Sequence, residues 1–219
     1  MFFRKKRPYR HPPPQRGTIL YEKKGSGGVI PIHEFEKLSG AAFISELDFI
    51  DESVHSAVRE KIAKLRAKER LSREQIWLGS YFHREIESNF LPEVSIRWID
   101  DDLGWGVFAE KAFQKMDFIA EYSGLIRKSK RSDRKNGYCF EYLYAPGIPS
   151  KFTIDAENQS GIARFINHSS KPNLDGSIAT YDGMNHVVLF AKEPIAKGTQ
   201  LTYDYGPVYW SRREKPRAL

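Results

Sequence analysis

The amino-acid sequence predicts a mostly β protein of the α+β class, in which a helical segment precedes a region of short strands. A chain of 219 residues with 40% hydrophobic content is long enough to bury a core of its own. Helical periodicity is confined to residues 53–89, whereas short β-rich runs alternate with Gly, Pro and Asp/Asn turns from residue 94 onward. Strands and helices do not alternate, which argues against a Rossmann fold.

Residues 1–28 are predicted to form a basic, flexible arm. Residues 1–24 hold eight Lys/Arg against one Glu, which accounts for the whole net charge of +7. Prolines at positions 8 and 12–14 favour polyproline geometry, and the Arg-Lys-Lys-Arg run at 4–7 is consistent with a nuclear-import signal, an anion-binding arm or a solubilising tail. Residues 25–28 (GSGG) are interpreted as a flexible link, because they lack the Lys and the strand-to-helix context of a phosphate loop.

Residues 29–92 are expected to form a mainly helical lead-in. Apolar residues recur at helical spacing from Val54 to Leu65, and Ser72 with Gln75 fits a capping box that opens a second helix. His83 and Glu87 lie one turn apart and could bind a metal, but a solvated helix face is the favoured interpretation. One face of the second helix is expected to pack on the next domain or on a second copy of the chain: Trp77, Tyr81, Phe82 and Ile86.

Residues 93–206 are expected to form the β domain, followed by a short tail at 207–219. Seven runs rich in β-branched and aromatic residues are bounded by turn residues, which is the pattern of short antiparallel strands. These runs are residues 94–98, 107–108, 118–122, 138–144, 152–154, 186–191 and 200–205.

Several functional classes are excluded by what the sequence lacks. The apolar runs are too short to span a bilayer, and the N-terminus has no apolar stretch of a signal peptide, so a soluble protein is expected. A single cysteine, Cys139, excludes an internal disulfide or a multi-cysteine zinc site. Phosphate-loop, dinucleotide-binding, HExxH and GxSxG motifs are absent. Acidic residues 100–102 could hold a cation or a basic peptide, although a solvated turn is favoured.

Three segments in the β region carry residues suited to a binding or catalytic site. Residues 104–106 (GWG) lie between two predicted strands, where glycine allows a ligand to approach the backbone. Residues 164–173 (RFINHSSKPN) place amides and an imidazole in a turn-rich stretch, and residues 198–206 (GTQLTYDYG) place two tyrosines on one strand face. Each segment alone is a weak signal, but their order and spacing together are specific.

These segments resemble the motifs of the SET-domain protein lysine methyltransferases. The similarity includes GWGVFA with the following EYSG, FTIDA with the later GIARFINHSSKPN, and GTQLTYDYG, and it extends over about residues 94–205. The layout is most similar to the small SET proteins of chlamydiae. The resemblance implies a SET fold of small antiparallel sheets with a knot-like crossing, S-adenosyl-L-methionine as methyl donor and a protein lysine as acceptor.

The resemblance also implies roles for individual residues. Tyr205 matches the catalytic tyrosine of the family, and Tyr203 matches the position that limits the number of methyl groups, which predicts mono- to dimethylation. Cofactor contacts are implied for Gly104, Trp105, Gly106, Tyr138, Arg164, Phe165, Asn167, His168 and Tyr205, and Trp210 is the candidate cap over the site.

The chain departs from the family pattern where many members bind zinc. Ser170 stands where those members carry a cysteine, and residues 207–219 contain none, so no metal is expected. Something else must then cover the site. Trp210 is the candidate, and the alternative is that this side chain packs on the helical lead-in.

The expected partner is a lysine-rich protein, either a histone or a bacterial histone-like protein. Residues 25–206 have a net charge of −3, which weakly supports a basic substrate. Residues 4–16 could add indirect contact with nucleic acid; no membrane partner is expected, and a homodimer is left open. The expected location is the bacterial cytoplasm or nucleoid, or a host nucleus if the protein is an exported effector. The competing interpretation is a catalytically weak SET module that binds peptide or chromatin.

Overall fold

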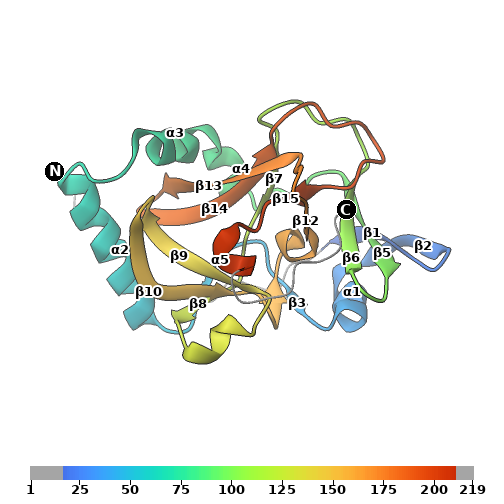
Figure 1. Cartoon of the computed structure of the whole chain (residues 1–219), viewed down its shortest axis with the longest axis horizontal. Coiled ribbons are helices and arrows are strands. Elements are labelled where there is room, and N and C mark those ends of the chain that lie inside the picture. Colours follow the sequence, from blue (N-terminus) through green and yellow to red (C-terminus); the bar gives the residue numbers. More distant parts are fainter. Residues whose placement is uncertain (1–16, 211–219) are drawn as a thin grey trace.

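The computed structural model describes residues 17–210 and has five small sheets surrounded by short helices (Figure 1). The mostly β class with a few helices is therefore confirmed. The predictions for residues 1–16 and 211–219 lie outside the described residues. No helix between residues 17 and 210 combines the length and apolarity that a membrane crossing requires.

Part of the predicted arm is an ordered hairpin, so the prediction of a flexible link at residues 25–28 was wrong. Strands β1 (Thr18–Lys23) and β2 (Ser26–Pro31) pair antiparallel around Lys24 and Gly25, whose φ angles are 51° and 79°. Two positive φ values define the tight turn that suits the twist of a hairpin. Strand β1 also pairs in parallel with β5 (Val94–Asp100), so the hairpin belongs to the four-stranded sheet β2-β1-β5-β6.

The helical lead-in contains four helices, two of which follow the predicted periodicity closely. Helix α1 (Ile32–Ser39) was not predicted, whereas α2 (Glu52–Ala67), α3 (Arg73–Tyr81) and α4 (His83–Glu87) occupy the expected stretch. Asp51 caps α2 by accepting the Val54 N–H at 2.9 Å. The capping box is confirmed, since Ser72 Oγ accepts the Gln75 N–H at 3.0 Å and Gln75 Oε1 accepts the Ser72 N–H at 2.9 Å.

The aromatic face predicted for the second helix divides into two faces. Phe82 is 1% exposed and packs against β-sheet residues, whereas Trp77 is 51% exposed and Tyr81 is 50% exposed. The rings of Trp77 and Tyr81 stack on each other at 5.0 Å. The buried side of α3 lies so close to β13 (Leu174–Tyr181) that a Cβ at Gly79 would come within 1.9 Å of the Thr180 carbonyl oxygen. The prediction that this face packs on the next domain was therefore wrong for Trp77 and Tyr81, and packing on a second copy stays a prediction.

The β region contains the predicted strands and several that sequence reasoning missed. The longest pairing joins β13 to β14, and β9 pairs with β10; both pairings are antiparallel. Strands β8 and β13 were not predicted. The remaining elements are β3 (Ala42–Phe43), β4 (Asp48–Phe49), β6 (Gly104–Ala109), β7 (Phe118–Glu121), β8 (Leu125–Lys128), η1 (Arg131–Arg134), β9 (Cys139–Ala145), β10 (Ile148–Asp155), β11 (Gln159–Ser160), η2 (Ile162–Phe165), β12 (Asn167–His168), β14 (Met184–Ala191), β15 (Thr202–Tyr203) and α5 (Pro207–Trp210).

A largely buried ion pair joins β14 to the last residue of the short strand β7. His186 Nδ1 lies 2.8 Å from Glu121 Oε1, and the Glu121 side chain is 4% exposed. Burial alone would lower the pKa of His186, but the charge and hydrogen bond of Glu121, the Tyr181 backbone and Asp182 raise this pKa overall. The imidazole is therefore held toward its charged form inside the sheet.

Candidate functional site

The last two sequence segments meet in a short parallel strand pair, β12 (Asn167–His168) with β15 (Thr202–Tyr203), which is called the crossing below. Strand β12 pairs with β15, with Asn167 opposite Thr202, and both lie beside the sheet that contains β6 (Figure 1). The Asn173 side chain holds the closing segment in place: its amide donates to the Gln200 carbonyl at 2.8 Å and its oxygen accepts the Thr202 N–H at 2.9 Å. Segments about 35 residues apart in the chain thus become one structural unit.

The glycine-containing segment on β6 packs tightly against this crossing. The Asn167 amide donates to the Trp105 carbonyl at 3.1 Å. A Cβ at Gly106 would lie 2.6 Å from Ile99 Cδ1 and 3.2 Å from the Asn167 amide nitrogen, so a larger residue there would require these side chains to shift. The three segments singled out in the sequence therefore meet at one place.

A cleft of about 1530 Å³ opens at this meeting point. Of the residues predicted for the site, Gly106 is the exception: it packs behind the cleft and does not line it. The predicted residues that do line the cleft are Gly104, Trp105, Tyr138, Arg164, Phe165, Asn167, His168, Tyr203, Tyr205 and Trp210.

Helix α5 places aromatic rings over the crossing. The Trp210 indole is stacked on the Tyr205 ring at 6.1 Å with an angle of 6° between planes, and lies 4.8 Å from the His168 ring. Tyr209 contacts Tyr205 edge-on at 4.7 Å. Trp210 therefore lies on the site, and the alternative that it packs on the helical lead-in was wrong.

The Tyr205 hydroxyl is fixed in direction by the backbone. It donates to the Ile166 carbonyl at 2.8 Å, while the Tyr205 N–H donates to His168 Nδ1 at 3.2 Å. Because Nδ1 accepts this hydrogen bond, the neutral imidazole carries its proton on Nε2. The chain crossing thus orients both the phenol and the imidazole.

The tyrosines of the site are buried enough to stay protonated. Burial, followed by the neighbouring Tyr209, raises the pKa of Tyr205, and burial with the neighbouring phenols raises the pKa of Tyr203 well above its ordinary value. The two rings are 4.7 Å apart. These hydroxyls are therefore neutral hydrogen-bonding groups near pH 7 and not bases.

Tyr122 and Lys23 are among the lining residues that sequence reasoning missed. The Tyr122 hydroxyl donates to the Tyr138 carbonyl at 3.0 Å, and burial raises the pKa of Tyr122 as well. Lys23, at the end of β1, lies with its ammonium 4.5 Å from the Trp98 ring centre and 5.4 Å from that of Trp105. Alternation of β-rich residues marked Tyr122 as a strand residue, whereas nothing in the sequence indicated that β1 reaches the cleft.

The cleft offers hydrogen-bond donors to a ligand. The Arg164 guanidinium stacks on the Tyr138 ring at 3.9 Å and donates to the Ala156 carbonyl at 3.1 Å. Among residues 17–210, the buried N–H groups without an acceptor include three on residues that line the cleft: Arg164 Nε, Trp98 Nε1 and Trp210 Nε1. A ligand with several acceptor atoms and a planar ring fits such a lining, and S-adenosyl-L-methionine has both features.

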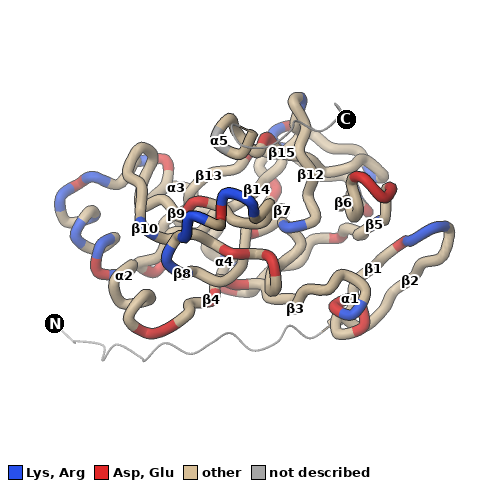
Figure 2. Tube along the Cα trace, turned by 60° about the horizontal axis from the view of Figure 1, so that its bottom comes forward, with Lys and Arg blue, Asp and Glu red and all other residues tan. Residues whose placement is uncertain are grey.

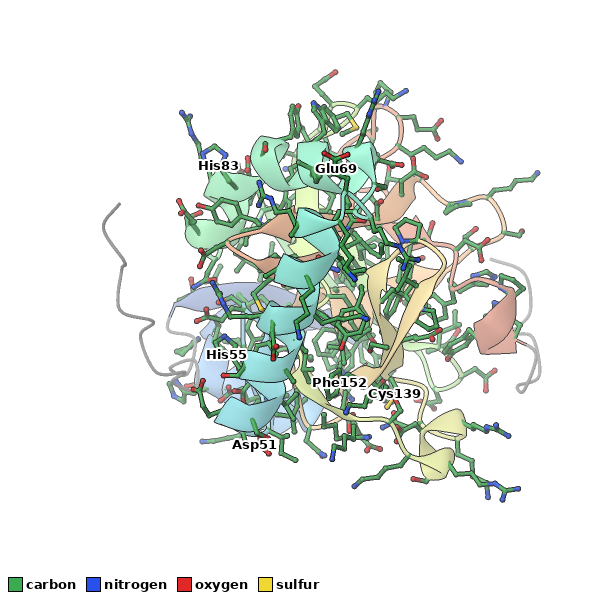
Figure 3. All side chains as sticks on the ribbon, turned by 90° about the vertical axis from the view of Figure 1, so that its left-hand side faces the viewer. Asp51, His55, Glu69, His83, Cys139 and Phe152 are labelled. Atoms are coloured by element: carbon green, nitrogen blue, oxygen red, sulfur yellow. The ribbon has the colours of Figure 1, made fainter. Side chains whose placement is uncertain are left out.

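No group of three His, Cys, Asp or Glu side chains within residues 17–210 is arranged to hold a metal ion. Figure 3 shows Cys139, His55 and His83 in separate parts of the molecule. His83 Nδ1 lies 2.8 Å from the Ser80 carbonyl, consistent with a helix-surface role. The Asp100 carboxylate accepts two backbone N–H groups of residues 102 and 103, which makes the acidic run a turn at the edge of the cleft.

A comparison with known families finds a match over most of the region that contains this site. Residues 104–206 match the family model described as SET domain, and this stretch includes β6, the crossing and the Tyr203–Tyr205 segment. Most of the residues that line the cleft lie in this matched stretch, which is therefore similar to a SET domain.

Similar proteins share about half of this chain. Histone-lysine N-methyltransferase Su(var)3-9 of Drosophila melanogaster is 38% identical over 114 residues, covering 47% of this chain and 18% of that protein. The H3 lysine-4 specific histone-lysine N-methyltransferase of Aspergillus fumigatus is 37% identical over 107 residues, covering 46% of this chain and 8% of that protein. The chain spans less than a fifth of these relatives.

A solved structure is also similar over part of the chain. The crystal structure of KRYPTONITE in complex with mCHH DNA, an H3(1-15) peptide and SAH has 32% sequence identity and a TM-score of 0.45, covering 52% of this chain and 23% of that chain.

Proposed function

We propose that this protein transfers methyl groups from S-adenosyl-L-methionine to lysine side chains of histones or histone-like basic proteins. The observation that carries the proposal is the convergence of Trp105, the Asn167–His168 strand and Tyr205 in one cleft, with the Tyr205 hydroxyl held by the Ile166 carbonyl. The similarity to the histone-lysine N-methyltransferases of Drosophila melanogaster and Aspergillus fumigatus supports a histone substrate.

The cleft residues would hold the cofactor mainly by shape, stacking and hydrogen bonding. Arg164 and Trp210 offer buried N–H donors, and Tyr138, Phe165 and Trp210 offer flat surfaces. When bound, S-adenosyl-L-methionine supplies a methyl group activated by a sulfonium. The protein therefore does not need to generate an electrophile, and positioning is the main catalytic contribution.

The same residues would prepare the lysine. A lysine ammonium has an ordinary pKa near 10.4, so the neutral amine costs roughly 4 kcal/mol near pH 7. Burial among tyrosine rings disfavours the charged form and lowers that pKa. The hydroxyls of Tyr203 and Tyr205, which stay protonated, orient the amine and require no strong base.

Tyr203 is proposed to limit the product to mono- or dimethyl-lysine. Its side chain is buried, 4.7 Å ring to ring from Tyr205, so its hydroxyl occupies space beside the acceptor amine. The variant Tyr203→Phe is expected to shift the products toward higher methylation, measured by mass spectrometry of a single-lysine peptide. An unchanged product distribution would remove Tyr203 from this role.

The decisive experiment is mass spectrometry of histones and bacterial histone-like proteins after incubation with the full-length protein and isotopically labelled S-adenosyl-L-methionine. Label on lysine residues is the expected result, and it would identify the substrate and the methyl count together. Calorimetry with unlabelled cofactor is the companion measurement. Cofactor binding without label on any of these proteins would overturn the proposal and favour a SET module that binds without transferring methyl groups.

A further inference from the structure

A run of exposed cations lies on the rim of the cleft, between β8 and β9. Residues 128–135 carry five exposed Lys/Arg side chains and a single acidic residue. Figure 2 shows this run in blue in front of β8 and β9. Several of these residues line the same cleft as Tyr138 and Tyr205. The five residues, called the basic rim below, are Lys128, Lys130, Arg131, Arg134 and Lys135.

Inward ion pairs fix the shape of this run. The half-buried Asp133 accepts two hydrogen bonds from Arg127, at 2.8 and 3.0 Å, and Arg127 also pairs with Asp155 at 2.7 Å. Asp133 accepts the Lys130 N–H at 2.7 Å as well. Although partial burial opposes ionisation, these hydrogen bonds lower the pKa of Asp133. The one acidic group is thus turned inward, and the outer face of the run presents cations.

This concentration of positive charge is local. Outside residues 128–135, the stretch 25–206 holds 18 Lys/Arg against 25 Asp/Glu. The basic rim is therefore an isolated positive patch on a body that is otherwise acidic. Like charges repel, so a free lysine-rich peptide would be disfavoured at this rim. The rim must serve a partner of the opposite charge.

The composition of the run favours phosphate over a protein surface. Residues 128–135 contain no apolar or aromatic residue, whereas protein contacts depend on apolar and aromatic anchors at their centre. Lys, Arg and Ser side chains are the groups that contact nucleic-acid phosphates, and Ser129 and Ser132 add exposed hydroxyls. The absence of a stacking ring in this run favours the backbone over the bases as the contact.

We propose that the basic rim binds the phosphate backbone of duplex DNA, independently of its sequence. The inference rests on the proposed function, because a lysine-rich substrate bound to DNA would bring both the phosphates and the target lysine to this cleft. The rim then selects substrates in their DNA-bound form, in which part of their own positive charge is neutralised.

The test is fluorescence anisotropy of a labelled duplex of about 25 base pairs with the full-length protein, at about 50 and 200 mM salt. Replacing Lys128, Lys130, Arg131 and Arg134 with Ala is expected to weaken binding at least about tenfold. It should also reduce the salt dependence, with the slope falling by about 0.9 for each lost phosphate contact. The matched control carries Ala in place of four other exposed cations: Arg66, Lys68, Arg70 and Arg73. None of these four residues lines the cleft.

The control and wild type should bind alike, since both keep the rim and the N-terminal arm. The exchange variant Lys130→Arg with Arg131→Lys keeps the charge and should also bind like wild type, and thermal unfolding checks that each variant is folded. Equal loss in the control, or full binding by the fourfold rim variant, would overturn the proposal. Rim-dependent binding of polyglutamate but not of DNA would also overturn it, in favour of an acidic protein partner. Anisotropy needs no methyl transfer, so this result is independent of the proposed function.

Discussion

The variant Tyr205→Phe removes one hydroxyl and tests whether this hydroxyl contributes to methyl transfer as well as to stability. The hydroxyl donates to the Ile166 carbonyl at 2.8 Å, and Ile166 is fully buried. The variant leaves that carbonyl without this donor, which costs about 1–3 kcal/mol of folding free energy. The ring itself remains in place, packed between Tyr203, Tyr209 and Trp210.

The effect on methyl transfer is expected to be larger than the effect on cofactor binding. The aromatic packing that shapes the cleft is kept, so the cofactor Kd should change little. The oriented hydroxyl beside the reacting groups is lost, and removal of one such preorganised group typically lowers kcat about 10²–10³-fold, or about 2.7–4 kcal/mol. A fall in kcat with a nearly constant cofactor Kd is the predicted signature.

The assay combines label transfer to a histone peptide, calorimetry with the cofactor, and urea unfolding. Tyr142→Phe is the matched control: this tyrosine is also buried, its hydroxyl accepts the Asn185 N–H at 3.2 Å, and it does not line the cleft. The control should lose stability and keep kcat. Equal losses of kcat in the two variants, or normal kcat in Tyr205→Phe, would refute the catalytic assignment.

Three further perturbations test the framework. Asn173→Ala removes both hydrogen bonds to the closing segment and should lower the free energy of unfolding by about 1–3 kcal/mol, measured by urea unfolding. Cofactor affinity should fall in parallel. Retained affinity would show that the crossing does not depend on this amide. Gly79→Ala drives a Cβ into the Thr180 carbonyl and should lower stability by at least about 1–3 kcal/mol in a thermal melt; an unchanged Tm would contradict the close packing. His186→Gln tests the raised pKa of the His186 imidazole. The ion pair with Glu121 stabilises the fold fully below about pH 6.5, and this stabilisation is lost as the pH rises through the pKa of His186 in the folded protein. The stability difference from wild type should therefore shrink between pH 6 and 9, and a constant difference would exclude the charged pair.

Local patterns predicted the elements that are stabilised locally. Helices α2 and α3 show regular apolar spacing and side-chain caps at Asp51 and Ser72, all of which act within a few residues. The error on α3 has a geometric cause. Trp77 and Tyr81 are four residues apart and share one face, whereas Phe82 lies about 100° further around the helix and faces the sheet. Grouping all of them as one stripe merged two faces.

The hairpin at residues 18–31 was missed because its stability comes from a distant strand. A Gly-Ser-Gly-Gly run is typical of a flexible link, and only the pairing of β1 with β5, more than 70 residues away, converts it into part of a sheet. The same pairing brings Lys23 to the cleft, next to Trp98 and Trp105. A contact of this kind depends on register between distant strands, which no local pattern specifies.

The residues that meet at the cleft could be named from the sequence because each motif is contiguous, but their arrangement in space depends on the crossing. Asn167 and Asn173 were singled out as polar side chains in a turn-rich stretch. The amide of each donates a hydrogen bond to a backbone carbonyl of another segment. They align the strand pair β12–β15, and that alignment places the Tyr205 hydroxyl against Ile166 and its N–H against His168. Because Tyr203 and Tyr205 stay protonated, the proposed methyl transfer would rely on positioning, and the positions of these groups depend on the two amides as well as on the phenol itself.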